Sequence, residues 1–267
     1  MSGTCYKEKL FNAIKNGDCE LVNWMLKKSP PLLLETDEHG NRIHLQAAYF
    51  GQKGVMCDLL YEFYLPLESR NKYGGNIMFS AVGGGNMEII EYLMEEENLS
   101  LNVKAKNGAT LLLEAAFNGQ IEVMKFLLNH NASLKEETRK GTNALLMAVF
   151  GGHLEAVKWL IEEQHCDIHF ENKLNNTALG EAVLYNHLDI VQYLVGCNSN
   201  LNSGVNPPIM VAANHGNVDI IHELIVNGAT YDLDTIIGTL TKKDENLAND
   251  LLLRLQPSKA KSAKSVK

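Results

Sequence analysis

Hydrophobic side chains recur along much of the chain at intervals of three and four residues, which is the spacing of one face of an α-helix. Residues 119–128 place their large apolar side chains on a single side: Ile121, Val123, Met124, Leu127 and Leu128. Residues 152–161 and 186–195 repeat this arrangement. A shorter apolar segment precedes each of them, for example residues 110–116. The pattern therefore predicts pairs of short helices, the second of each pair being amphipathic.

The predicted helix pairs recur at a nearly constant interval. One column, of glycine in all but one unit, contains Gly17, Gly51, Gly85, Gly119, Gly152, Asn186 and Gly216, with spacings of 34, 34, 34, 33, 34 and 30 residues. An alanine column precedes it with the same spacings: Ala13, Ala47, Ala81, Ala115, Ala148, Ala182 and Ala212. A third column follows eight positions later: Met25, Leu59, Leu93, Leu127, Leu160, Leu194 and Leu224. Three columns in one register over seven units establish an internal repeat.

Residues between the helices indicate where each element begins and ends. Thr110 and Thr177 stand where a side-chain hydroxyl can cap the first helix of a unit. A left-handed cap after the second helix is expected at one shared position: Asn98, Asn131, Asn198 and Gly228. A glycine turn follows an extended stretch in several units: Gly40, Gly74, Gly108 and Gly141. The connection is therefore expected to be a short β-hairpin.

A pair of helices this short cannot bury its apolar face alone, so neighbouring units must stack into a continuous core. The sequence resembles the ankyrin-repeat family over about residues 5 to 231, and residues 108–115 and 177–182 carry the family pattern most clearly. The resemblance implies an all-α ankyrin-repeat solenoid of stacked helix-turn-helix units with short β-hairpin fingers. We expect about seven repeats and a C-terminal cap. Arg42 and His44 depart from the pattern in the second unit, and the finger around residues 204–207 is short.

The repeat register predicts how the chain is divided. One ankyrin-repeat domain is expected over residues 1–256, with a basic tail at residues 257–267. The predicted units lie near residues 4–36, 37–70, 71–104, 105–137, 138–171, 172–202 and 203–231, with a C-terminal cap at 232–256. The tail contains four lysines and no acidic residue. Its low complexity predicts disorder.

Composition narrows the class of protein. The 267 residues are 45% hydrophobic and carry a formal net charge of −8. This acidic balance argues against general nucleic-acid binding, and no apolar run approaches the roughly 18 residues of a membrane span. No secretory signal is visible, and the five cysteines form no CxxC pair, so reduced thiols and a cytoplasmic location are expected. We also expect a monomer without a cofactor.

Most residues that resemble catalytic or metal-binding groups are explained by their position in the repeat. Residues 165–169 contain two histidines, a cysteine and an aspartate, but in register they form the turn that leads into a finger. His153 and His187 follow the glycine column, where the family often uses histidine to tie helix ends. His44 occupies a core leucine column, so we expect a hydrogen-bonded interior histidine, with partner contact or pH sensing as the alternatives. No P-loop or nucleophile signature is present, and no enzyme is predicted.

Two other groups of residues are explained by packing or solvation. An aromatic column in the second helices is expected to pack between repeats: Trp24, Tyr92, Phe126, Trp159 and Tyr193. Acidic clusters at residues 95–97 and 162–163 are expected to form a solvated outer face.

Partner binding is expected on the concave face that the family uses, made of finger tips and exposed first-helix residues. Four successive fingers carry a cation there: Lys72, Lys106, Arg139 and Lys173. Large aromatic residues lie beside these cations: Tyr49, Phe50, Tyr73, Phe117, Phe150 and Tyr185. Cations over an aromatic strip predict a binding site for an acidic or amphipathic segment of a partner protein. The simpler interpretation is that the finger tips are merely polar and the aromatic residues half-buried.

The expected function is that of a protein–protein interaction module, acting as a scaffold, adaptor or inhibitor. One alternative is a secreted bacterial effector that engages host proteins in the host cytosol through the same surface. Another is attachment to nucleic acid or a membrane surface through the lysine tail. Both alternatives stay open at the level of sequence.

Overall fold

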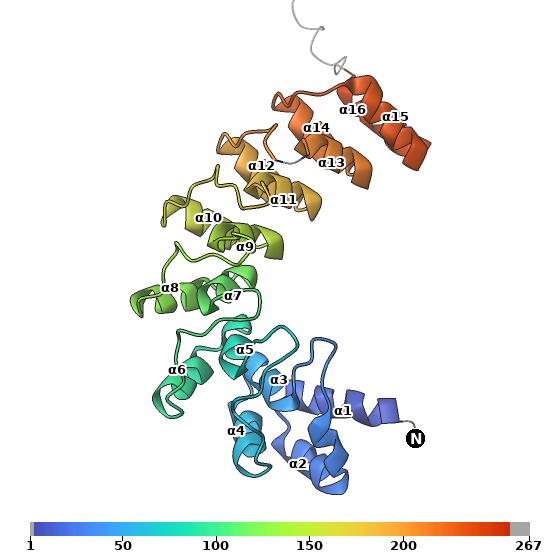
Figure 1. Cartoon of the computed structure of the whole chain (residues 1–267). Helices are drawn as coiled ribbons and strands as arrows, with labels where there is room; N and C mark the ends of the chain where they lie inside the picture. Colours follow the sequence, from blue (N-terminus) through green and yellow to red (C-terminus); the bar gives the residue numbers. More distant parts are fainter. Residues whose placement is uncertain (1–2, 205, 257–267) are drawn as a thin grey trace, which may run out of the picture. The chain divides into compact units, whose positions relative to one another are not determined.

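The structure is a computed structural model that describes residues 3–204 and 206–256 (Figure 1). Over these residues it consists of sixteen α-helices and one 3-10 helix, joined by turns and short fingers, without an extended β-sheet. The helices divide into an N-terminal unit, Met1–Trp159, and a C-terminal unit, Leu160–Lys267, and α10 (Leu154–Glu162) crosses the division. The fold is therefore all-α, as predicted from the repeat. The basic tail lies outside the described residues.

The N-terminal unit contains four complete helix pairs and the first helix of a fifth. The helices are α1 (Gly3–Lys15), α2 (Cys19–Lys28), η1 (Pro30–Leu34), α3 (Ile43–Tyr49), α4 (Lys53–Tyr61), α5 (Ile77–Gly83), α6 (Met87–Glu95), α7 (Leu111–Phe117), α8 (Ile121–Asn129) and α9 (Ala144–Gly151). The first helices pack in the order α1, α3, α5, α7 and α9, and α2 packs on α4. Members of the alanine column in this unit are buried, which lets the helices of a pair lie close together.

The C-terminal unit continues the same arrangement. Its helices are α11 (Ala178–Leu184), α12 (Leu188–Gly196), α13 (Pro208–His215), α14 (Val218–Val226), α15 (Leu233–Lys243) and α16 (Glu245–Leu255). Helix α13 packs between α11 and α15, and α14 packs between α12 and α16. Helices α15 and α16 also pack on each other, as expected for a closing pair.

The fingers are tight turns closed by backbone hydrogen bonds. In the third finger, Ala105 N–H donates to the Ala109 carbonyl over 2.9 Å, and Lys104 and Thr110 form an isolated antiparallel bridge. The predicted turn glycines have positive φ, and Asn175, with φ of 57°, takes the same role in the C-terminal unit. The predicted left-handed caps also have positive φ: Asn98, Asn131, Asn198 and Gly228.

Helix capping differs in part from the prediction. Thr177 caps α11 as expected, because its hydroxyl accepts a hydrogen bond from the Gly180 N–H at 3.1 Å. The prediction for Thr110 is wrong, since its buried hydroxyl makes no capping bond. The side-chain amide oxygens of Asn76 and Asn143 cap α5 and α9 instead. Both asparagines occupy the repeat position of Thr110 and Thr177, so the capping position is kept while the capping residue varies.

The aromatic column of the second helices is not uniformly part of the core. Trp159 is buried as predicted, whereas Tyr92, Phe126 and Tyr193 are only half-buried. The prediction is wrong for Trp24, which is 53% exposed. Helix α2 belongs to the first pair, and among the described second helices its main packing partner is α4.

None of the described helices is long and apolar enough to cross a lipid bilayer.

Candidate partner-binding surface

The predicted binding residues of the N-terminal unit lie at finger tips and at the C-terminal ends of first helices. We call this surface the finger face. Lys72, Tyr73, Lys106 and Arg139 are exposed in the fingers, whereas Tyr49, Phe50, Phe117 and Phe150 lie at the ends of α3, α7 and α9. These are the elements on which partner-binding residues were expected.

The finger cations also connect neighbouring fingers, a role that the sequence did not suggest. The Lys106 ammonium donates to the carbonyl of Lys72 over 2.9 Å, and the Lys72 ammonium donates to the carbonyl of Glu38. Backbone bonds follow the same order, as in the 2.8 Å bond from Arg139 N–H to the Asn107 carbonyl. An ammonium group has three donors, so each lysine keeps donors for a partner. Lys72 and Lys106 therefore have a structural role and retain hydrogen-bond donors for a partner.

Most aromatic side chains of the finger face are open to solvent. Tyr49 is 44% exposed, Phe50 36%, Tyr73 55% and Phe150 39%, whereas Phe117 is half-buried. The Tyr49 and Phe50 rings meet edge to face with centroids 5.3 Å apart, and the Phe117 and Phe150 rings lie at the same separation. Exposed aromatic groups at this density are typical of protein interfaces.

The two remaining predicted residues belong to the C-terminal unit. Lys173 is exposed in a finger turn that the Asn172 side chain closes by accepting hydrogen bonds from two backbone N–H groups. Tyr185 follows α11 and is 43% exposed. Burial of its hydroxyl raises the pKa of Tyr185, and the nearby Glu181 carboxylate adds to the shift. This unit thus presents a cation and an aromatic ring of its own.

Glu114 is a part of the finger face that sequence reasoning missed. It lies on α7 directly before the alanine column, is half-buried, and accepts a 3.1 Å hydrogen bond from the Asn118 side chain. Burial raises the pKa of Glu114, and the Asn118 bond opposes that shift. The sequence did contain an indication: the residue directly before the alanine column is acidic in only two repeats, at Glu114 and Glu181.

We expect Glu114→Gln to stabilise the protein at neutral pH. A carboxyl whose pKa is raised in the folded state binds protons more tightly there than in the unfolded chain, so its ionisation lowers stability as pH rises. The amide is isosteric and can still accept the bond from Asn118. Urea unfolding at pH 7 should therefore show a higher midpoint for the variant, with a smaller difference near pH 4. A variant less stable than the parent at pH 7 would contradict this account.

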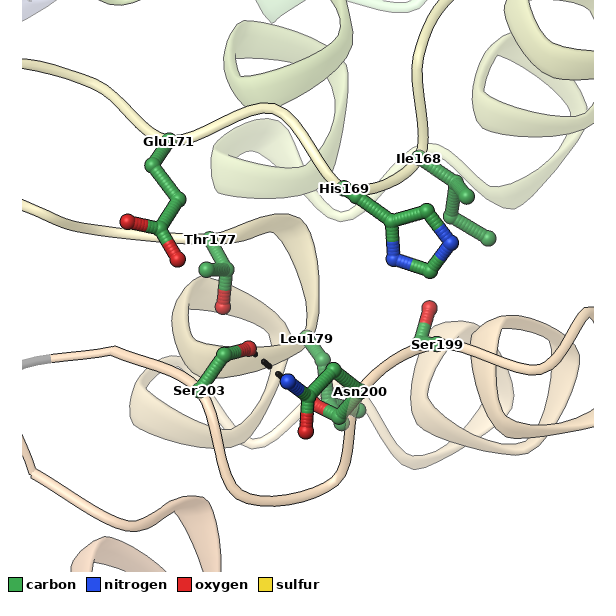
Figure 2. Close-up of a pocket in the computed structure, with 8 residues that line it drawn as sticks. All are labelled: Ile168, His169, Glu171, Thr177, Leu179, Ser199, Asn200 and Ser203. Atoms are coloured by element: carbon green, nitrogen blue, oxygen red, sulfur yellow. Dashed lines mark hydrogen bonds between the residues drawn. The ribbon is translucent and has the colours of Figure 1, made fainter.

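A small polar hollow lies between two successive fingers of the C-terminal unit. It has a volume of about 180 Å³, and Figure 2 shows the eight lining residues: Ile168, His169, Glu171, Thr177, Leu179, Ser199, Asn200 and Ser203. The His169 ring and the Ser199 hydroxyl point toward each other. Within the described residues the buried Ser199 hydroxyl has no hydrogen-bond partner. The hollow can hold several waters or one side chain.

His44 is interior, as predicted from its column, and its ring makes no hydrogen bond of good geometry within the described part of the chain. The side chain is fully buried in α3, and neither ring nitrogen has a hydrogen-bond partner among the residues described. Burial lowers the pKa of His44 to about 4, and the positive charge of Arg42 contributes in the same direction. The backbone of Pro66 opposes this shift to a smaller extent. The imidazole is therefore neutral at physiological pH, as a hydrophobic core requires.

Side-chain amides, more than histidines, hold the ends of helices in neighbouring repeats together. Asn86 donates to the carbonyls of Ala48 and Tyr49, both at 2.8 Å, and thereby holds the end of α3. His153 instead places its ring against Gly119 and Gly151. These contacts fix the backbone on which the finger-face aromatics stand.

The described residues contain no group of three or more His, Cys, Asp or Glu side chains able to hold a metal ion. Four cysteines in the same part of the chain are free thiols: Cys19, Cys57, Cys166 and Cys197.

Stacked pairs of short helices joined by projecting fingers define a repeat solenoid. A family model described as ankyrin repeats (3 copies) matches residues 44–138, 96–169 and 145–235, and the chain belongs to the ankyrin-repeat family. Ankyrin repeats form protein–protein interaction modules and are typically non-enzymatic scaffolds.

A solved structure supports the same fold. The human ASB11 ankyrin repeat domain is similar to this chain with a TM-score of 0.60 and 23% sequence identity, over 80% of this chain and 98% of that domain. A comparison with curated proteins found no match.

Proposed function

We propose that the protein binds an acidic or amphipathic segment of a partner protein on its finger face, the concave face of the repeat array. The observation that supports this proposal is that cations at the finger tips and aromatic rings at the ends of the first helices are both exposed in the N-terminal unit. The chain as a whole is acidic, with a formal net charge of −8, so this face differs in charge from the whole.

The two kinds of side chain would contribute differently to binding. Aromatic rings such as Tyr73 and Phe150 offer large, stiff apolar surfaces whose desolvation favours a specific complex. The cations would attract acidic residues of the partner, raise the association rate and set the register of the segment. Recognition of this kind needs no chemistry, which fits a scaffold, adaptor or inhibitor.

Reversing three finger cations together should strongly weaken partner capture. We expect Lys72→Glu, Lys106→Glu and Arg139→Glu in one full-length chain to lose proteins that the parent retains from a whole-cell lysate. Because the new carboxylates repel acidic residues of the partner that the cations attracted, association should slow by roughly tenfold or more at low salt. Mass spectrometry of the captured proteins, followed by surface plasmon resonance with an identified partner, measures both effects.

A matched control carries the same charge change on the second helices. Lys53, Lys125 and Lys158 form exposed ion pairs with Glu88, Glu122 and Glu155, so their reversal should cost little stability. Because Lys72 and Lys106 also form hydrogen bonds to neighbouring fingers, the thermal stability of both triple variants must be measured to show that each is folded in the capture experiment. Equal losses from the two folded triple variants, or from neither, would refute a charge-guided finger face.

A further inference from the structure

We propose that Glu114 forms a subsite for an arginine side chain of the bound segment, together with Tyr49 and the Phe117–Phe150 ring pair. The inference rests on the proposed function, because it concerns the same face. It adds that the segment must carry a positive charge toward the first helices as well as acidic residues toward the fingers. The partner is thereby defined as an amphipathic segment of mixed charge.

The row of aromatic residues along the first helices is interrupted at Gly83. Gly83 shares its register position with Tyr49, Phe117 and Phe150, so α5 is the one helix among these four without a large side chain there. A Cβ atom on Gly83 would lie 3.2 Å from Glu114 Oε1, 3.4 Å from Asn118 Nδ2 and 3.4 Å from Tyr49 Cε2. The missing side chain therefore brings a carboxylate and an aromatic ring together over α5.

The carboxylate at this point has no compensating cation. Within the described part of the chain, no lysine or arginine nitrogen comes within 4.0 Å of Glu114. Its side-chain contact is the amide of Asn118, which also donates to the Glu114 carbonyl over 2.9 Å. A half-buried carboxylate without a counter-charge is electrostatically unfavourable until a cation arrives. The free protein thus carries a charge that a bound cation would neutralise.

Arginine fits this arrangement better than lysine. Its guanidinium is planar, is weakly hydrated, stacks on aromatic faces and donates in pairs to a carboxylate. Tyr49 is exposed beside the carboxylate, and Phe117 follows Glu114 by three residues, on the same side of α7. A lysine ammonium would meet the carboxylate but gain less from the rings. The chemistry therefore assigns the subsite to arginine.

The C-terminal unit contains a second pairing of the same kind. Glu181 occupies the register position of Glu114, is half-buried, and accepts a hydrogen bond from the Asn176 side chain. Burial raises its pKa, and its charge acts on the exposed Tyr185. A half-buried carboxylate directly before the alanine column, near an exposed ring, thus occurs in both units.

The test uses a phage-displayed random peptide library selected on the full-length protein. Peptides that lose binding to the Lys72→Glu, Lys106→Glu, Arg139→Glu protein are kept, and their sequences are aligned. We expect a recurrent arginine among acidic and apolar residues. Its change to alanine should weaken binding to the parent by about tenfold, as should Glu114→Gln, and the two changes together should cost little more than either alone. Glu122→Gln on the exposed face of α8 is the matched control and should leave affinity unchanged.

The outcomes separate the two proposals. A failure to select any peptide that depends on the three finger cations would overturn the proposed function and the subsite with it. Peptides that need those cations but bind the Glu114→Gln protein as tightly as the parent would overturn the subsite alone. Enrichment of lysine in place of arginine would also overturn it. Non-additive losses from the peptide arginine and Glu114 would establish that the two groups meet.

Discussion

Replacing His44 with leucine is expected to remove about 3 kcal/mol of acid-induced destabilisation between roughly pH 6.5 and pH 4. The corresponding position in other units holds Leu10, Met78, Leu112 and Leu145, all buried in the core of the same unit. Leucine therefore suits the space, whereas the His44 imidazole leaves two buried nitrogens without hydrogen bonds in the described structure. We expect the variant to be at least as stable as the parent at pH 7.

The sign of the pH effect follows from the direction of the shift. Burial lowers the pKa of His44 to about 4 in the folded protein, while the unfolded chain has the ordinary value of 6.5. Between these values the unfolded chain binds the additional proton, so stability rises with pH and is lost as the solution is acidified. Above about pH 6.5 neither state holds the proton, and the contribution no longer changes.

Urea unfolding of the parent and His44→Leu at several pH values from 7 to 4.5 measures this difference. His39→Gln serves as the control, since it removes an exposed imidazole in place of the buried one. Parallel losses of stability in the parent and His44→Leu would show that other groups, and not His44, determine the acid sensitivity.

The repeat was predictable because its signals are local and recur. A column of small residues, a left-handed position after each second helix and a glycine turn are requirements of the backbone, and each reappears about every 34 residues. Positive φ at Asn98 and Asn131 follows directly from such a requirement. Fold class and the placement of fingers could therefore be deduced without any contact between units being known.

Contacts between units could not be deduced in the same way. The bond from Lys106 to the Lys72 carbonyl depends on the distance between two fingers, and a sequence column contains no such distance. The same applies to Glu114, whose carboxylate approaches Tyr49 because Gly83 on the neighbouring helix has no side chain. His44 was placed correctly in the core, but the expectation of a hydrogen bond rested on the general rule that buried polar groups are paired. Here burial lowers the pKa of His44 and keeps the ring neutral, and in the described structure its two nitrogens still lack hydrogen bonds of good geometry.

The finger face combines groups that favour folding with groups that oppose it. Lys72 and Lys106 form hydrogen bonds between neighbouring fingers and so stabilise the surface on which they lie. Glu114 has the opposite effect, because its half-buried charge lacks a counter-charge within the described residues. Stability given up at one position of an otherwise well-packed face is common where a protein binds a ligand. This contrast is the reason for testing Glu114 and the finger cations with separate variants.

Gly84→Ala is expected to destabilise the protein by roughly 1–3 kcal/mol and to weaken partner binding as well. Gly84 follows α5 with φ of −77°, a conformation that alanine adopts readily, so backbone strain is not the cause. A Cβ atom there would overlap the carbonyl oxygen of Tyr49 and the side-chain amide of Asn86. The end of α3 would have to move away from α5, and the two finger-face aromatics at that end would move with it.

Two further glycines test whether the effect of Gly84→Ala comes from the close approach of two backbones. Gly151→Ala should behave like Gly84→Ala, because its Cβ would overlap the Phe117 carbonyl of the neighbouring first helix. Gly238→Ala should have the opposite effect and stabilise by up to about 1 kcal/mol, since the site lies inside α15 and the new methyl group would meet nothing within 4 Å beyond the adjacent backbone of its own helix. Urea unfolding of the three variants, with binding measured for a partner or selected peptide, tests the account. If Gly84→Ala were as stable as the parent, the first helices could separate at little cost, and their close packing would not be what positions Tyr49 for binding.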